Sequence, residues 1–235
     1  MNTHETVLIR VPEGMQWMVY HSTVLSDLTA VIRYHDQQSL KDCIESIGIP
    51  HTEIESCSVD SILVMSSHIM SPEEVITIEP RETLPYKGQR FILDAHLGKL
   101  ATYLRLLGFN AVYFSDIDHP QILEGAEGSV ILTRSRELLK HKLIAEGMLI
   151  RDTQVQEQVK EVMKRYQLIG SQRFLYRCSN CNGLLHEVSK ESIAEDLEEE
   201  TTLYIDSFFQ CASCGKIYWY GSHYAKLENL LDDIR

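Results

Sequence analysis

The 235-residue sequence has no long apolar run, no long repeat and no excess of positive charge. A membrane-spanning helix needs roughly 18 or more consecutive apolar residues, and no stretch approaches that length. The first ten residues, MNTHETVLIR, have neither the basic region nor the apolar core of a signal peptide. These absences argue against a membrane or secreted protein, so a cytoplasmic location is the default expectation.

Positive charge is scarce because 22 Lys and Arg residues stand against 34 Asp and Glu residues, which gives a net charge of −12. Counted by segment, residues 1–85 carry −9, residues 86–170 carry +2 and residues 171–235 carry −5. Such a total argues against strong, non-specific coating of nucleic acid. Only the middle segment can approach a polyanion without strong repulsion, so a local site for nucleic acid is expected there rather than elsewhere in the sequence.

Cysteine is also sparse, but four of the six cysteines form two C-x2-C pairs. Such pairs in a reducing compartment are typical of metal ligands rather than disulfides. Each pair puts two thiolates on one tight turn, and four thiolates fill a tetrahedral zinc site. We therefore predict a structural zinc ion held by Cys178, Cys181, Cys211 and Cys214. The two remaining cysteines, Cys43 and Cys57, are expected to be plain buried or half-buried residues.

The first 85 residues predict a small mixed α+β domain. The segments TVLIRV and LTAVIRY read as strands, and a helix is expected from Ser39 to Gly48, with Asp42 completing a capping pattern. The strand-like segments SILVM and VITIEP follow. Two strands, a helix and two strands over about 80 residues predict a ubiquitin-like β-grasp domain at 1–85.

Strands and helices alternate in the next segment, which favours a parallel sheet covered by helices. The short strands are FILD, AVYF, VILT and MLIR, and apolar residues recur at helical spacing between and after them. We therefore expect an α/β and α+β multi-domain protein. Its central α/β domain is expected at 89–170 and its zinc ribbon at 173–235.

Aspartates follow several of these central strands directly. Asp94 follows FIL, Asp116 and Asp118 follow AVYF, and Asp152 follows LIR. Residues just past parallel strands gather at the carboxyl edge of a sheet, where clustered carboxylates favour a bound Mg²⁺ or Mn²⁺. Such an ion can activate water against a phosphodiester bond. The alternative is that these aspartates cap helices or lie in solvated turns.

The segment after VILT is the most basic part of the chain, with Arg134, Arg136, Lys140 and Lys142. These side chains either contact RNA phosphates or form a solvated helix face. An aromatic run follows the last cysteine and contains Tyr218, Trp219, Tyr220 and His223. It either stacks on unpaired bases or packs around the metal centre.

Residues 89–235 resemble the mut-seven C-terminal RNase family, which joins a PIN-like nuclease domain to a zinc ribbon. The matching segments are FILDAHLGKLATYLRLLGFN, AVYFSDID, VILTRSRELL, CSNCNG and CASCGKIYWYGSH. The first segment of the chain resembles the ubiquitin-like domain often fused ahead of this nuclease, on the residues SLKDCIESIGIPHTEI and VITIEP. Sulfur carriage is not expected, because no free diglycine terminus follows that domain.

The resemblance implies RNA cleavage assisted by a divalent metal, Mg²⁺ or Mn²⁺, bound to aspartates. Asp94 matches the first family aspartate, and Asp116 and Asp118 match the acidic stretch after the second strand. Ser135 stands where the family motif Thr-Arg-Asp has its aspartate. Because a hydroxyl is a poor ligand for a hard cation, this departure puts catalysis in doubt. The expected function is a metal-dependent ribonuclease. The alternative is a non-catalytic module that binds RNA, or a protein partner through the acidic first domain.

Overall fold

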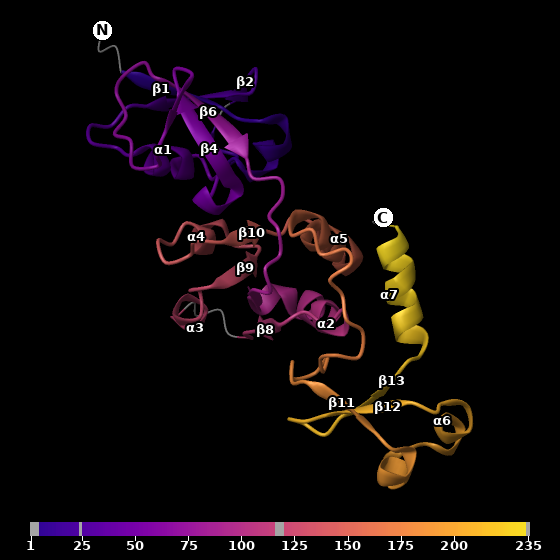
Figure 1. Cartoon of the computed structure of the whole chain (residues 1–235). Coiled ribbons are helices and arrows are strands. Elements are labelled where there is room, and N and C mark those ends of the chain that lie inside the picture. The colour runs from indigo at the N-terminus through magenta and orange to yellow at the C-terminus, as the bar shows by residue number, and fades with distance from the viewer. Residues whose placement is uncertain (1–4, 24, 116–119, 234–235) are drawn as a thin grey trace. The chain divides into compact units, whose positions relative to one another are not determined.

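A computed structural model describes residues 5–23, 25–115 and 120–233 (Figure 1). Their contacts divide the chain into two compact units. The first unit contains residues up to 82 together with 133–149, and the second contains 83–132 together with the residues from 150 onward. No helix in the described ranges is long and apolar enough to cross a membrane.

The first unit is built on a six-stranded mixed sheet of order β2-β3-β1-β6-β4-β5. Its strands are β1 (Thr6–Arg10), β2 (Leu25–Ser26), β3 (Thr29–Arg33), β4 (Ile54–Val59), β5 (Ile62–Val64) and β6 (Val75–Pro80). The central strand β1 pairs parallel with β6 and antiparallel with β3. This arrangement confirms the predicted β-grasp fold. A 3₁₀ helix, Glu13–Met18, connects β1 to β2.

The helix of this sheet is α1 (Leu40–Ser46), and its start follows the predicted capping pattern. Ser39 Oγ accepts a hydrogen bond from the Asp42 amide at 3.1 Å and donates to Asp42 Oδ2 at 2.7 Å. These bonds satisfy an amide that the first helical turn leaves without a partner. Leu40 and Ile44 are buried, so α1 presents its apolar side to the core.

The sequence prediction missed strand β4. Its sequence, IESCSV, has two polar residues between Ile54 and Cys57, and only Cys57 and Val59 of this strand are buried. Polar residues dominate the run, so its period of two was weak as a strand signal. Pairing with both β5 and β6 nevertheless fixes it as an inner strand.

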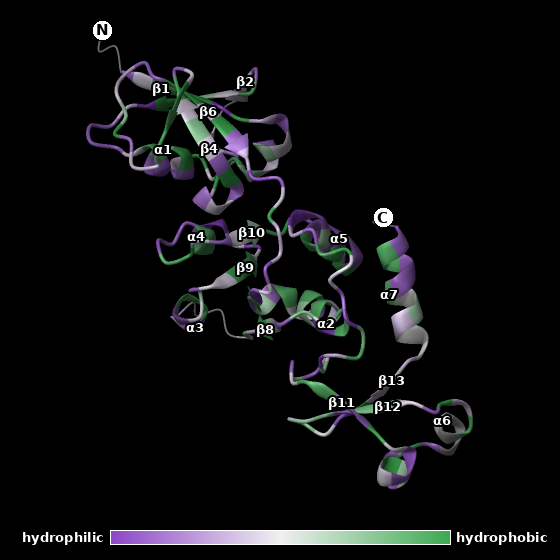
Figure 2. Ribbon diagram, viewed as in Figure 1, coloured by the Kyte–Doolittle hydropathy of each residue, from purple (hydrophilic) through white to green (hydrophobic). Residues whose placement is uncertain are grey.

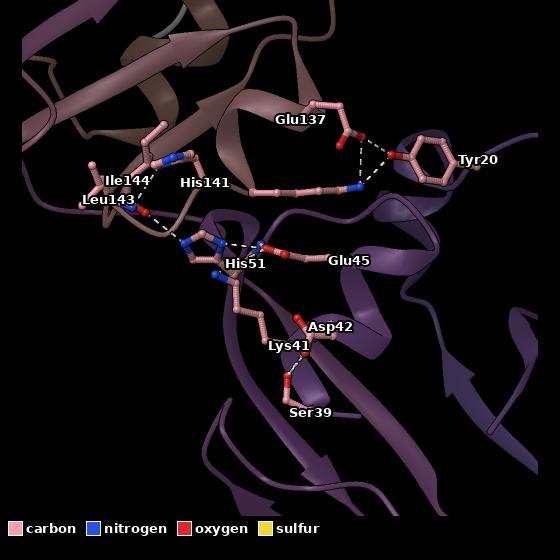
Figure 3. A network of polar contacts seen from close by, with 11 residues as sticks. Tyr20, Ser39, Lys41, Asp42, Glu45, His51, Glu137, His141, Leu143 and Ile144 are labelled. Carbon is pink, nitrogen blue, oxygen red and sulfur yellow. Dashed lines mark hydrogen bonds and ion pairs between the residues drawn. The ribbon is translucent and has the colours of Figure 1, made fainter. Parts of the chain in front are cut away.

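The first unit also holds α4 (Arg136–Leu139) and β10 (Gly147–Leu149). The buried carboxylate of Glu53 accepts a hydrogen bond from the Leu149 amide at 2.6 Å. His51 contacts Glu45 through Nδ1 at 2.7 Å and the Ile144 carbonyl through Nε2 at 2.9 Å (Figure 3). Segment 133–149 is therefore fastened to the β-grasp residues by buried and half-buried polar contacts.

The second unit contains a parallel sheet with β7 (Arg90–Leu93) between β8 (Ala111–Tyr113) and β9 (Ser129–Thr133). Every residue of β9 is buried, as expected for a strand covered on both faces. Its helices are α2 (Gly98–Leu106), α3 (Pro120–Glu124) and α5 (Val155–Arg165). α2 packs against β8 and α5. One side of α5 is apolar and the other polar, as its colouring in Figure 2 indicates. The predicted parallel α/β layer is confirmed.

The C-terminal part of this unit is a three-stranded antiparallel sheet, β11 (Leu185–Val188), β12 (Phe208–Cys211) and β13 (Ile217–Trp219). The acidic stretch between the cysteine pairs forms a 3₁₀ helix, Lys190–Asp196, and α6 (Glu199–Tyr204). The last helix is α7 (Ser222–Asp232).

Buried hydrogen bonds join this small sheet to the α/β layer. The guanidinium of Arg105 on α2 donates to the carbonyls of Ala111 at 2.7 Å, Asn180 at 2.9 Å and Ser179 at 3.2 Å. The side chain of Asn182 accepts from the Ala111 amide at 3.2 Å. The turn that carries the first cysteine pair is therefore held directly against α2 and β8.

Gly108 offers a test of this junction. Its φ is +91°, and a Cβ added there would lie 2.2 Å from the Arg173 carbonyl oxygen. We expect Gly108→Ala to destabilise the protein by about 2 kcal/mol or more, because backbone rather than a flexible side chain must move. Gly128→Ala is the matched control, since its φ is +65° but its Cβ would meet open space. Urea unfolding measures both, and equal losses would contradict the steric argument.

Candidate metal centre and nuclease site

The four cysteines of the C-x2-C pairs come together at one end of the small sheet. Their sulfur atoms all lie within 4.8 Å of one another. Cys178 Sγ lies 3.6 Å from Cys214 Sγ, and Cys181 Sγ lies 3.4 Å from Cys211 Sγ. Sulfur atoms bound at about 2.3 Å to a tetrahedral zinc ion are separated by about 3.8 Å. The donor set and spacing therefore fit one metal ion with four thiolate ligands.

The backbone of the two turns prepares these thiols for a metal. The Cys181 amide donates to Cys178 Sγ at 3.4 Å, and the Ser213 amide donates to Cys211 Sγ at 3.4 Å. Each turn then passes through a left-handed residue four positions after its first cysteine, Asn182 at φ +67° and Gly215 at φ +73°. Residues that tolerate positive φ are needed there, as the sequence indicated.

Ionisation of Cys178 is favoured by its surroundings. Burial opposes it, but hydrogen bonds from Tyr218 and from nearby backbone amides outweigh burial and lower the pKa of this thiol to about 6. Tyr218 Oη lies 3.0 Å from Cys178 Sγ. A thiol that ionises near neutral pH is ready to act as a metal ligand.

The pKa values of the two remaining cysteines are shifted in the opposite direction to that of Cys178. Cys43 on α1 and Cys57 on β4 are buried in the β-grasp sheet, as predicted. Burial raises the pKa of Cys43 to about 12 and that of Cys57 to about 11. Both thiols therefore stay protonated and inert at neutral pH.

Asp94 lies at the carboxyl end of the central strand β7. Asp94 is 5% exposed, and its Oδ1 accepts a hydrogen bond from the His96 amide at 3.0 Å. His96 Nδ1 lies 3.3 Å from the same oxygen, and its side chain is exposed. Asp116 and Asp118, the other predicted catalytic residues, lie outside the described residues. The structure therefore places one member of the predicted carboxylate group.

Ser135 has a local structural role at the position of the family aspartate. It caps α4, because its hydroxyl accepts a hydrogen bond from the Leu138 amide at 3.3 Å. The Ser135 amide in turn donates to Thr133 Oγ1 at 2.9 Å. Aspartate and asparagine cap helices as well as serine does, so the fold leaves all three residues possible here.

Asp152 fits the turn alternative rather than a ligand role. Its Oδ1 accepts a hydrogen bond from the Gln154 amide at 2.7 Å, just before α5 begins. The amides of Arg151 and Asp152 both donate to Glu161, and burial raises the pKa of that carboxyl. These contacts tie the loop to its own helix.

The predicted RNA-binding residues of segment 133–149 differ in their surroundings. Arg134 is exposed. Arg136 donates to the Trp17 carbonyl at 3.0 Å and lies 5.5 Å from the ring centre of Tyr20. Lys140 donates to Tyr20 Oη at 2.6 Å and to Glu137 Oε1 at 3.1 Å, and Tyr20 also bonds to Glu137 (Figure 3). Sequence patterns gave no signal for this pairing of Tyr20 with the basic stretch.

The aromatic run after the last cysteine divides into buried and exposed rings. Tyr218 is buried against Cys178, in line with packing around the metal centre. Trp219 is 37% exposed and Tyr220 is 47% exposed. The side chain of His223 lies outside what the structure describes. Packing beside the cysteines therefore holds for Tyr218, and stacking on bases stays a prediction for Trp219 and Tyr220.

A β-grasp sheet, a parallel α/β layer and a four-cysteine ribbon together define a modular α/β protein whose C-terminal sheet has a cysteine group that fits a metal ion. Residues 89–231 match the family model of the Mut7-C RNAse domain, and residues 20–84 match that of Mut7-C ubiquitin. The first match covers more than half of the sequence, so the chain belongs to the Mut7-C RNAse domain family. Comparison with curated proteins and with solved structures found no match. The resemblance recognised in the sequence is thereby confirmed.

Proposed function

We propose that this protein is a metal-dependent ribonuclease that hydrolyses RNA phosphodiester bonds. Asp94, Asp116 and Asp118 would hold a Mg²⁺ or Mn²⁺ ion. The proposal depends mainly on one observation: in a Mut7-C RNAse domain, a buried aspartate ends the central strand of the parallel sheet. Open α/β folds bind their ligands at that edge of the sheet.

Strand pairing supports the grouping of these three aspartates. Leu93 and Tyr113 are register partners in the parallel strands β7 and β8. Asp94 directly follows the first of them, and Asp116 follows the second by three residues. The two strands that precede these aspartates in the sequence therefore end side by side. The Asp94 carboxylate is oriented by the His96 amide.

A divalent ion held there would activate water and stabilise charge developing on the phosphate. The role of the protein is to orient the ligands and the RNA. We propose that Arg134, Arg136 and Lys140 contact RNA phosphates. Arg134 is exposed in this structure, whereas Arg136 and Lys140 would exchange contacts at Trp17 and Tyr20 for RNA. We also propose that the ribbon ion is zinc and that its role is structural, because four thiolates leave no open coordination position.

The first test is cleavage of short, labelled, single-stranded RNAs by zinc-loaded protein with and without added Mn²⁺. Omitting Mn²⁺ is preferable to adding a chelator, because a chelator would also strip the ribbon. Ser135→Asp restores the charged oxygen that the family motif has at this position, so we expect it to raise Mn²⁺-dependent cleavage about ten-fold or more.

Ser135→Asn is the matched control for that substitution. It has the size and the helix-capping ability of aspartate but no charge. We expect its cleavage rate to stay at the wild-type level. Equal rates for the two variants would mean that the residue at position 135 has no part in metal binding.

A non-catalytic function is the second candidate, and the capping role of Ser135 favours it. In that case the same fold would bind RNA, or would bind a protein through the acidic β-grasp domain. Retained RNA binding with no cleavage by wild type or by Ser135→Asp, with Mn²⁺ or with Mg²⁺, is the result expected of that module.

A further inference from the structure

The second unit contains a cavity of about 530 Å³ between α2 and β13. Thr102 and Leu106 line it from α2, and Lys216 and Trp219 line it from the β13 side. Ser179, in the first cysteine turn, adds a hydroxyl. The volume falls within the roughly 300 to 1,000 Å³ typical of sites for small molecules. Apolar walls with a few polar groups and one cation make up its lining.

Trp219 is the part of this cavity best suited to stacking. More than a third of the residue is exposed, although its ring packs at 63° against Phe208, with the two ring centres 6.2 Å apart. Phe208 itself is fully buried. The indole is thus held in a fixed position while one part of it faces solvent. Rings held in this way stack on bases at little cost in conformational entropy.

The electrostatics of the cavity favour a neutral group in its interior. Tyr218 lines the cavity and lies 3.0 Å from Cys178 Sγ. Four thiolates around one divalent ion carry about two net negative charges. A phosphate would be repelled at that depth, whereas a neutral planar base would not.

Cations lie at the rim, where a phosphate could be bound. Lys216 and Trp219 line both this cavity and a neighbouring one of about 410 Å³, which Asp196 and Glu198 also line. These two carboxylates repel a polyanion from the neighbouring cavity, which favours its approach along α2. Lys99 is exposed there, on the same helical face as Thr102 and Leu106.

The same helix connects this cavity to the proposed cleavage site. Asp94 caps the short 3₁₀ helix Ala95–Leu97, and α2 follows it directly. From Gly98 to Leu106 the helix rises about 12 Å. An RNA strand cut near Asp94 would therefore pass the cavity within a few nucleotides.

We propose that the cavity binds one unpaired base of single-stranded RNA, with Trp219 stacked on the base and Lys216 contacting an adjacent phosphate. The choice of RNA as ligand rests on the proposed ribonuclease function. The stacking geometry and the charge distribution are independent of cleavage. This assigns to the ribbon a substrate-binding role in addition to its metal site.

The experiment is a binding titration without added Mn²⁺, so that no cleavage is needed. The sequence contains two tryptophans, Trp17 and Trp219. A Trp17→Phe protein therefore reports on Trp219 alone. We expect saturable quenching of its fluorescence by a short, unstructured RNA. An oligonucleotide of the same length with abasic sites is expected to bind at least about five-fold more weakly, because base stacking is lost.

Two substitutions separate the contacts. Trp219→Leu is expected to weaken binding of labelled RNA by about 5-fold to 100-fold. Lys216→Gln is expected to make the slope of log K against log salt concentration less steep, by the amount that about one phosphate contact contributes. Tyr204→Leu is the matched aromatic control, since Tyr204 is highly exposed but lines neither cavity. One metal ion per chain in each variant verifies that the ribbon is folded.

The outcomes distinguish this proposal from the proposed cleavage. Quenching and the Trp219→Leu loss without any Mn²⁺-dependent cutting would leave the base site standing and reject the nuclease. Cutting with no quenching, or RNA affinity unchanged in Trp219→Leu, would reject the base site and leave the nuclease standing. Equal binding of intact and abasic RNA would also overturn the base site, because the contacts would then be to phosphate alone.

Discussion

Removal of the ribbon metal is expected to unfold the ribbon while the β-grasp sheet stays folded. The cluster beside the cysteine group consists of the buried Cys178, Cys211 and Tyr218, with the partly buried Leu175, Leu185 and Phe209 packed against it. So small a core cannot offset the chain entropy of some 60 residues. Structural zinc sites contribute about 10 to 16 kcal/mol of binding free energy, which is more than most domains have in total.

The loss should extend into the α/β layer. Arg105 would lose its contacts with the carbonyls of Ser179 and Asn180, and its buried guanidinium would be left with fewer partners. The unfolding of the second unit is therefore expected at lower temperature after chelation. The β-grasp sheet contains none of the four ligands, so its own transition should move little.

Metal content and thiol reactivity measure this effect. We expect one zinc ion per chain in the wild type and none in Cys178→Ser, with Cys57→Ser as the matched control that keeps its zinc. After chelation at pH 7.5, four thiols should react rapidly with a disulfide reagent. Cys43 and Cys57 should react slowly, because burial holds their pKa values at about 12 and about 11, well above the pH of the assay. Six equally fast thiols would contradict separate stability of the β-grasp sheet.

The elements that the sequence predicted correctly are those with strong local signals. The helix after Ser39, the buried strands of the parallel sheet and the two cysteine turns each rest on residues close together in the chain. The strand β4 was missed because its serines mask the alternation that tertiary pairing later enforces. Local propensity is informative only where tertiary packing does not override it.

Contacts between distant segments were beyond the reach of sequence patterns. The pairing of Tyr20 with Lys140 joins residues 120 positions apart, and the bond from the Leu149 amide to Glu53 joins residues 96 apart. Neither has a periodicity or motif that could reveal it. The same is true of the cavity beside Trp219, since its walls come from α2 and from the ribbon. Motifs in the sequence identified the candidate ligand residues, but only the folded structure shows which residues surround them.

Asp94→Asn is expected to lower Mn²⁺-dependent RNA cleavage by about 100-fold or more, because a charged ligand for the ion is replaced by a neutral one. The substitution should leave the fold intact. Asparagine keeps the oxygen that accepts the hydrogen bond from the His96 amide. Loss of activity would then report loss of charge rather than loss of structure.

Asp152→Asn is the matched control for Asp94→Asn. Asp152 also follows an apolar segment and also accepts a hydrogen bond from a backbone amide two residues on, that of Gln154. Its charge has no part in the proposed site. Cleavage by Asp152→Asn should therefore stay within about two-fold of the wild-type rate.

Ion binding can be separated from catalysis by thermal unfolding in increasing Mn²⁺. An ion that binds only the folded state raises the Tm, and the rise grows with the logarithm of the ion concentration once that concentration exceeds the Kd. We expect Mn²⁺ to raise the Tm of the wild type and of Asp152→Asn, and to have little effect on Asp94→Asn. A Tm rise that persists in Asp94→Asn would show that the ion is bound elsewhere, and the proposed role of this aspartate would have to be abandoned even if cleavage were observed.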